Sequence, residues 1–428
     1  MSETRPHGPD DARRVVEAVW RMESAKIVAA LTRTVGDLDL AEDLAGQALL
    51  AALEQWPGTG VPRNPAAWLT SVATRRAIDG WRRRDRLDER YAYLARELRD
   101  DASKFDTDAW DPDRIDDDVL RLMFVACHPV LNRNAQVVLT LRVVGGLSTD
   151  EIAKAFLTRT TAVQQRIVRA KKALTAARVP FEVPDREAFP SRLSAVLGVI
   201  YLIFNEGYVA SSGDDWIRAD LADEALRLGR ILAELLPEEH EVHGLVALME
   251  LTASRFAARA TPDGEPILLA DQDRTRWNRA QINRGIAALA RADAIGRGRG
   301  PYGLQAAIAE CHSRALTFED TDWDRIVLIY EILARVAPSP VVDLNHAAAL
   351  SMAEGPAVAL EHVDRLAASG TLAGYHLLPS VRGELLRRVG RRVEARGELL
   401  EAARLTGNER ERAVLLAKAE EVRESFDL

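Results

Sequence analysis

The chain has 428 residues, enough for about two to four domains, and 47% of them are hydrophobic, so it can bury substantial cores. Its formal net charge of −8 argues against nonspecific coating of nucleic acid, so any such binding requires local clusters of cations. The start lacks a secretory pattern and the longest apolar-rich run, 193–204, is too short for a bilayer, which predicts a cytoplasmic protein without membrane contact.

The first clear helical period lies at 45–56. Apolar residues recur there at the spacing of one face of an amphipathic helix, namely at Ala45, Leu49, Ala52, Leu53 and Trp56. Nearly every later segment has the same kind of spacing, and alternating strand-like patterns are scarce. The sequence therefore predicts an all-α fold.

A basic region follows at 63–86. It holds seven arginines, opposed only by Asp79 and Asp85, and it interleaves Trp68 and Trp81. Arginines over phosphates, with aromatic faces for unstacked bases, suit single-stranded DNA. The alternative is that both tryptophans are core residues; we favour the core for Trp68 and base stacking for Trp81.

Two linkers divide the chain. Between 97 and 118 there are ten acidic and three basic residues and few large apolar ones, which predicts a solvated acidic linker at 96–118. Three prolines in "VPFEVPDREAFP" mark a second linker at 179–190. The predicted domains are therefore 10–95, 119–178 and 191–428.

The end of the second domain has the pattern of two short helices. Ser148 is followed three residues later by Glu151, a capping box that starts a helix. After a turn at Leu157–Thr158, a second helix places apolar residues on one side, namely Val163, Ile167, Ala170 and Leu174. This arrangement predicts a helix-turn-helix.

The polar side of the second helix is purely cationic. Residues 158–178 include six basic residues and no acidic one. Glutamine can pair with adenine edges, and arginine and lysine reach guanine or phosphate, so this face suits the major groove. The alternative is a solvated helix that packs on one face only.

The third domain shows repeat character near its end. Gly355 and Gly390 lie 35 residues apart, each between two helical segments. This spacing is close to the period of about 34 residues of tetratricopeptide units, in which paired helices stack on a shared core. We therefore expect a helical, tetratricopeptide-like extension.

No enzymatic motif stands out. The extension has carboxylates at Glu206, Asp271, Asp273, Asp322 and Asp324, but no phosphate-binding glycine loop, HExxH motif or nucleophile elbow accompanies them. Helix caps and interhelical hydrogen bonds account for them more simply, so we expect no catalytic residue.

The two cysteines indicate neither a disulfide framework nor a zinc site. Cys127 and Cys311 lie far apart in sequence, without a CxxC motif or nearby ligand residues. We expect reduced, buried thiols, no bound metal and no cofactor.

The order of these parts resembles a known family. "DLDLAEDLAGQALLAALEQW", "NPAAWLTSVATRRAIDGWRRR" and "GLSTDEIAKAFLTRTTAVQQRIVRAKKAL" resemble the two-domain core of bacterial extracytoplasmic-function sigma factors of the sigma-70 family. Later segments such as "YLIFNEGY" and "PSPVVDLNHAAAL" resemble the subgroup with a long C-terminal tetratricopeptide-like extension. The resemblance implies a region 2 bundle at 10–95 and a region 4 helix-turn-helix at 119–178.

The resemblance implies that the helix from Leu38 to Trp56 docks on core RNA polymerase. The matching polar positions are Glu42, Asp43 and Gln47. Relatives commonly have a glutamate after that glutamine, where this chain has Ala48, so one charged contact is expected to be missing.

The resemblance also implies two contacts with promoter DNA. The helix from Trp68 to Arg84 matches the surface that melts and reads the minus-ten element, through Arg75, Arg76, Asp79, Trp81, Arg82 and Arg83. The helix-turn-helix matches the reader of the minus-thirty-five element, through Thr161, Gln164, Gln165, Arg166, Arg169 and Lys171. Where relatives often begin that helix with proline and glutamate, this chain has Arg159 and Thr160, which makes the helix start more cationic.

Three hypotheses remain open. The first is a non-catalytic sigma factor whose extension packs on the sigma core or receives a protein partner and so modulates activity. The second is an autonomous helix-turn-helix regulator that binds an operator without polymerase. The third is a tetratricopeptide-like interaction scaffold.

Overall fold

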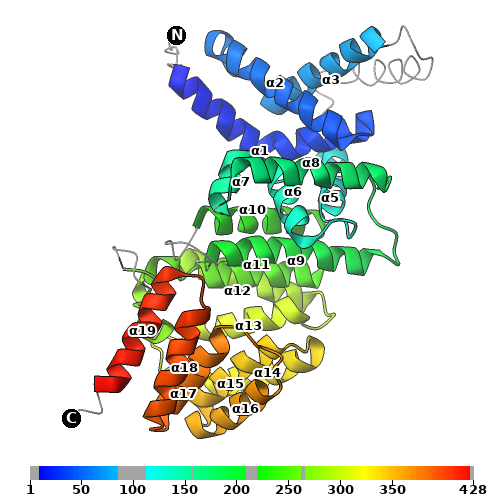
Figure 1. Cartoon of the computed structure of the whole chain (residues 1–428). Helices are drawn as coiled ribbons and strands as arrows, with labels where there is room; N and C mark the ends of the chain where they lie inside the picture. The colour runs from blue at the N-terminus through cyan, green and yellow to red at the C-terminus, as the bar shows by residue number, and fades with distance from the viewer. Residues whose placement is uncertain (1–8, 85–111, 157, 209–218, 262–265, 425–428) are drawn as a thin grey trace, which may run out of the picture. The chain divides into compact units, whose positions relative to one another are not determined.

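The computed structural model describes residues 9–84, 112–156, 158–208, 219–261 and 266–424, and of 9–15, 80–84, 112–117 and 423–424 it describes the backbone alone (Figure 1). Over these residues the fold is all-α, as predicted, with one isolated bridge between Ala260 and Pro266 in place of any sheet. The chain divides into two compact units, Met1–Ile200 and Tyr201–Leu428.

The first unit is built from helices on either side of residues 85–111. Its described helices are α1 (Pro9–Val35), α2 (Leu38–Thr59), α3 (Pro65–Arg84), α5 (Pro112–Ala126), α6 (Arg133–Val143), α7 (Thr149–Ala155), α8 (Thr160–Ala176) and the first part of α9 (Phe189–Tyr208). Helix α1 packs on α2, α3 and α5 and so lies at the centre of this unit.

Helix α2 buries a face rich in alanine. Asp37 caps its start by accepting hydrogen bonds from the backbone of Asp39 and Leu40. The buried residues are Ala41, Leu44, Ala45, Ala48, Ala51, Ala52 and Trp56. The predicted stripe is therefore partly wrong, because Leu49 and Leu53 stay half exposed. Short side chains on the buried face let α1 and α2 approach closely, and the longer leucines flank that contact.

Helix α5 begins earlier than the sequence indicated. Residues 112–118, assigned to the acidic linker, are helical, whereas residues 96–111 of that linker lie outside the described residues. Pro112 suits a helix start because its missing N–H would have no partner there. The Asp118 carboxylate is buried and accepts from Arg33 Nε at 2.8 Å and Arg121 Nη1 at 2.6 Å. Acidic composition alone did not reveal this buried ion pair.

The second unit is a run of helices and short 3-10 turns. Its elements after α9 are α10 (Ala219–Leu235), α11 (His240–Ala253), η1 (Phe256–Ala258), η2 (Leu269–Asp271), η3 (Arg274–Arg276), α12 (Arg279–Ala294), α13 (Pro301–Arg314), α14 (Trp323–Val336), α15 (Pro340–Ala353), α16 (Pro356–Ala368), α17 (Leu377–Arg388), α18 (Arg392–Leu405) and α19 (Glu409–Glu424). From α13 onward, each helix packs on the next (yellow to red in Figure 1).

The two glycines of the expected repeat lie in turns between these helices. Gly355 has φ +101° between α15 and α16, and Gly390 has φ +84° between α17 and α18. Glycine adopts these angles without the steric penalty of a side chain. The helix–glycine–helix pattern is therefore confirmed, while the tetratricopeptide comparison remains a prediction.

The polar residues singled out in the extension serve local structure where the structure shows their contacts. Asp273 and Asp322 cap η3 and α14 by accepting backbone N–H groups of Thr275 and Arg325. Cys127 and Cys311 are buried free thiols, as predicted. Within the described residues, no group of three or more metal-ligating side chains could hold an ion, and none of the helices is long and apolar enough to cross a bilayer.

Candidate nucleic-acid interface

The helix-turn-helix forms from the local signals in its sequence. Ser148 Oγ accepts from the backbone of Glu151 at 3.1 Å, and the Glu151 carboxylate accepts from the backbone of Ser148 at 2.8 Å, so the predicted capping box is confirmed. The connecting residues 156–159 include Leu157, which lies outside the described residues. Thr160 Oγ1, at the start of α8, donates to Asp150 Oδ1 at 2.7 Å and links the two helices.

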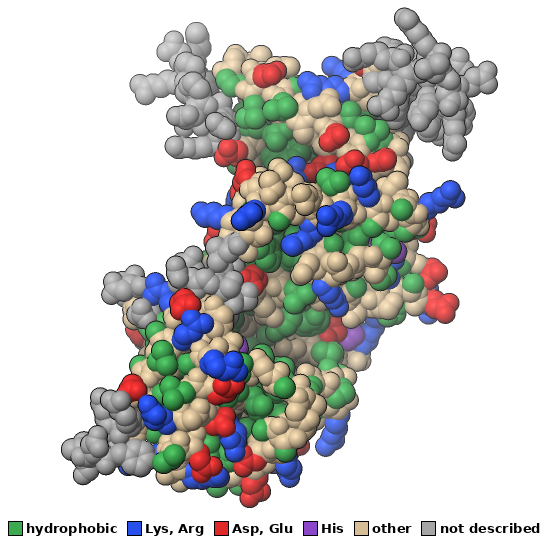
Figure 2. Space-filling model, in the orientation of Figure 1, with side chains coloured by type: hydrophobic (Ala, Val, Ile, Leu, Met, Phe, Trp, Pro, Cys, Tyr) green, Lys and Arg blue, Asp and Glu red, His purple; other side chains and the backbone are tan. Residues whose placement is uncertain are grey.

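Helix α8 has one apolar face and one polar face. Its buried residues are the four predicted ones, Val163, Ile167, Ala170 and Leu174. Of the predicted DNA-facing residues, Thr161, Gln164, Gln165 and Arg169 are exposed and Arg166 is half-buried. Figure 2 shows a band of Lys and Arg side chains over α7 and α8. The side chains on this face, apart from Lys171, are accessible enough to contact a DNA groove or the phosphate backbone.

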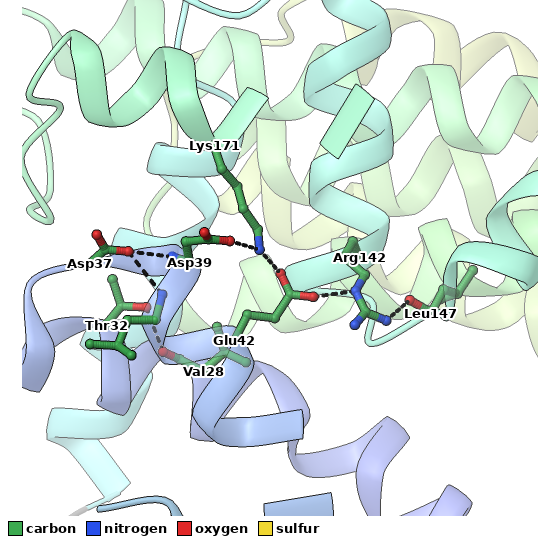
Figure 3. A network of polar contacts seen from close by, with 9 residues as sticks. Val28, Thr32, Asp37, Asp39, Glu42, Arg142, Leu147 and Lys171 are labelled. Carbon is green, nitrogen blue, oxygen red and sulfur yellow. Dashed lines mark hydrogen bonds and ion pairs between the residues drawn. The ribbon is translucent and has the colours of Figure 1, made fainter. Parts of the chain in front are cut away.

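Lys171 lies apart from the other predicted DNA-facing residues. Its ammonium pairs with Asp39 Oδ1 at 2.6 Å and Glu42 Oε2 at 2.8 Å, and its side chain is only 11% exposed (Figure 3). Burial alone would lower the pKa of Lys171, but the Glu42 and Asp39 carboxylates outweigh it and raise the pKa above its ordinary value. Lys171 is therefore charged and satisfied by α2, and it does not face solvent.

Of the three predicted polymerase-facing residues on α2, two are exposed and one is largely buried in ion pairs. Asp43 and Gln47 are exposed one turn apart, so they share a face. Glu42 is 11% exposed and pairs with Lys171 and with Arg142 Nε. Ala48 is fully buried, so its position belongs to the core here, and a glutamate there would be placed among apolar side chains.

The predicted minus-ten residues lie along α3. Arg75 and Asp79 are exposed, while Arg76 Nη1 donates to the Gln47 carbonyl of α2 at 2.7 Å. The side chains of Trp81, Arg82 and Arg83 lie outside the described residues. Trp68 packs edge-to-face on the buried Trp56 at a ring-centroid distance of 5.4 Å, in agreement with a core role.

Arg142 is the residue of this region that sequence reasoning missed. It lies on α6, pairs with Glu42, and donates from Nη1 to the Leu147 carbonyl at 3.0 Å. The available signal was a single cation within the apolar run "QVVLTLRVVGG". A cation in a buried segment needs a partner, and that requirement alone could have marked it.

We expect Ser148→Ala to destabilise the helix-turn-helix by about 1 kcal/mol, because the substitution leaves one N-terminal backbone amide of α7 unsatisfied. Hydrogen exchange of the α7 amides measures this loss directly. Thr149→Ala is the matched control at the neighbouring position, where no side-chain cap bond is made. Equal exchange in both variants would contradict the capping role.

In comparisons with known proteins, three segments of the chain match protein families, and the chain is similar to an uncharacterized protein and to a probable sigma factor. Residues 20–87 match Sigma-70 region 2, residues 121–174 match Sigma-70 region 4, and residues 192–293 match a family of unknown function (DUF6596). An uncharacterized protein of Rhizobium meliloti (strain 1021) is 45% identical over 393 residues, covering 91% of each chain. The probable ECF RNA polymerase sigma factor SigI of Mycobacterium tuberculosis is 28% identical over 168 residues, 39% of this chain and 57% of that protein.

Proposed function

We propose that this chain, which belongs to the extracytoplasmic-function sigma factors of the sigma-70 family that carry a long C-terminal extension, binds core RNA polymerase in the cytoplasm and directs it to specific promoters. The observation that carries the proposal is the exposed polar face of α8, with Gln164, Gln165 and Arg169 opposite a fully apolar buried face. Together with Arg75, which is exposed on α3, this face gives two separate surfaces for one DNA molecule.

In this proposal, the polymerase and not this chain carries out the nucleotide chemistry of transcription. Among the described residues, two of the candidate carboxylates, Asp273 and Asp322, cap helices, and no group of three or more metal-ligating side chains could hold an ion. We infer from the two sigma-70 regions that the chain is a non-catalytic subunit, which supplies binding energy and sequence choice, and that its extension modulates this activity. Phosphate neutralisation by the two cationic surfaces makes promoter binding steeply salt-dependent.

A reconstituted binding assay separates this function from the alternatives. The full chain is mixed with core polymerase and labelled promoter DNA, and each pair is tested alone. A sigma factor retains DNA at physiological salt only when polymerase is present. An autonomous regulator binds an operator alone, and an interaction scaffold retains neither polymerase nor DNA.

We expect Asp43→Lys to weaken binding of core polymerase by at least about tenfold. Asp43 is exposed on α2 and makes no hydrogen bond or ion pair among the described residues, so the change removes a carboxylate from the docking face without breaking an internal contact. Fluorescence anisotropy of labelled chain titrated with polymerase measures the effect.

The matched control is Glu187→Lys, which makes the same change of charge at an exposed position outside α2, in the connection before α9. It should bind as the unchanged chain does. Equal weakening by both substitutions would point to net charge, and no weakening by Asp43→Lys would count against α2 as the docking helix.

A further inference from the structure

A pocket of about 240 Å³ lies within the second unit, against α11, α13 and α14. Its polar lining residues are Arg255, Gln305, His312 and Tyr330. Its apolar lining residues are Leu248, Leu251, Leu269, Ile308 and Ala309. Along α11 and α13 these residues recur at the three- and four-residue spacing of one helix face, so each helix turns one face toward the pocket. None of them belongs to the surfaces proposed for polymerase or DNA.

The apolar part of the lining is suited to a hydrocarbon body of a ligand. Three leucines, one isoleucine and one alanine supply it, from α11, η2 and α13. A cavity of about 150 Å³ with a lining of this kind holds benzene. A pocket of about 240 Å³ therefore has room for one ring together with a short polar group.

Arg255 supplies the positive charge of the pocket. Its Nη2 donates to the Tyr208 hydroxyl, and its guanidinium lies 5.8 Å and 5.7 Å from the ring centroids of Tyr208 and Trp277. The side chain is half-buried and makes no ion pair with a carboxylate within the described ranges. A guanidinium that is held by aromatic faces and lacks a counter-ion is well placed to bind an anion from solution.

A second arginine adds to the positive potential there. Arg274 is buried, and its Nη1 donates to the His312 carbonyl at 2.7 Å. Burial and the nearby charge of Arg255 lower the pKa of Arg274, and together they outweigh the opposite influence of Glu319 and Asp320. The protein's own carboxylates therefore do not neutralise this end of the pocket.

The remaining polar groups of the pocket are neutral. Burial, with the charges of Arg255 and Arg274, lowers the pKa of His312 to about 3, and its buried Nδ1 has no hydrogen-bond partner. Burial raises the pKa of Tyr330 to about 12, and its hydroxyl makes no hydrogen bond with the part of the chain that the structure describes. Gln305 Oε1 accepts from the Tyr201 hydroxyl at 3.3 Å, which orients the amide. One guanidinium among neutral groups suits a ligand with a single negative charge better than a phosphate dianion.

We propose that this pocket binds a small organic acid, with its carboxylate on the Arg255 guanidinium and one ring or a similar apolar body among the leucines of α11 and η2. Arg255 and these leucines lie within residues 192–293, the segment that matches a family of unknown function, so the proposal gives part of that segment a role. Binding of the acid goes beyond the proposed function and requires neither polymerase nor DNA.

Isothermal titration calorimetry of the full chain with phenylacetate tests the site. Phenylacetate should bind one molecule per chain, and about tenfold or more tightly than 2-phenylacetamide, which has the same shape without the charge. Equal affinity for the two compounds would overturn the role of the guanidinium. Failure of phenylacetate to bind would overturn the assignment of the pocket to small organic acids.

Two substitutions locate the bound acid. Arg255→Met should weaken phenylacetate binding about tenfold or more and leave the affinity for 2-phenylacetamide within about twofold, which also shows that the pocket is intact. Arg279→Met is the matched control at an exposed position at the start of α12 and should change neither affinity. Ala309→Leu fills the pocket without changing charge and should abolish binding of both compounds.

The outcomes are independent of the sigma assignment, because the titration contains only the chain and the small molecule. Phenylacetate binding that survives both Arg255→Met and Ala309→Leu would place the acid elsewhere and overturn the proposal. Equal weakening by Arg255→Met and Arg279→Met would indicate an effect of net charge and would also overturn it. A chain that binds phenylacetate as expected but never binds polymerase would refute the proposed function and leave this site standing.

Discussion

Replacing Arg166 and Arg169 together by alanine is expected to lower the affinity of the assembled polymerase for promoter DNA by about tenfold to a hundredfold at physiological salt. Both residues lie on the polar side of α8, where Arg169 is exposed and Arg166 half-buried. If each arginine neutralises one phosphate, the plot of log affinity against log salt loses about two units of slope.

The measurement is a salt titration of holoenzyme binding to a promoter fragment. Arg186→Ala, an exposed arginine in the connection before α9, is the control for loss of positive charge away from α8. An unaltered slope in the double variant would remove α8 from the phosphate contacts. Loss of affinity with an unaltered slope would instead indicate that the arginines read base edges.

The helix-turn-helix could be predicted from sequence because its signals are local. The capping box at Ser148 and Glu151 specifies where α7 begins, and the period of Val163, Ile167, Ala170 and Leu174 specifies which side of α8 is buried. Helix propensity, capping and hydrophobic period all predict the same structure there, and a segment with such agreement can be predicted from its sequence.

The pairing of Glu42 with Arg142 and Lys171 could not be predicted. Arg142 and Glu42 lie 100 residues apart, and Lys171 and Asp39 lie 132 apart, so no local pattern links them. A charge on an amphipathic helix reads as solvent-facing, and only the tertiary contact shows that Glu42 and Lys171 are turned toward each other. The resemblance to sigma factors suggested what these side chains bind in a complex, not what they contact in the free chain.

The boundary of the acidic linker was misplaced for a related reason. Composition averages over a window, and the acidic residues up to Asp118 were counted together. Asp118 is distinguished from its neighbours by Arg33, which lies on a helix far away in sequence. The charge of a residue is therefore readable from sequence, but its burial against a partner is not.

Replacing Phe124 by alanine should have the largest effect on stability, about 3–5 kcal/mol, because the side chain is fully buried and its removal leaves a cavity. Its ring packs on Phe189 at a centroid distance of 5.6 Å, and its backbone carbonyl accepts from Arg192 Nη2 at 2.7 Å, so it joins α5 to the start of α9. Since a chain with two units need not unfold in one step, native-state hydrogen exchange of the α5 and α6 amides is the suitable measurement.

The control is Leu50→Ala, at a residue of α2 that is 59% exposed. It should change the free energy of opening of the same amides by less than about 0.5 kcal/mol. Phe124→Leu should fall between the two, because it fills part of the cavity. If Phe124→Ala costs no more than Leu50→Ala, the core of the helix-turn-helix region does not depend on this residue, and its attachment to α9 must come from polar contacts such as that of Arg192.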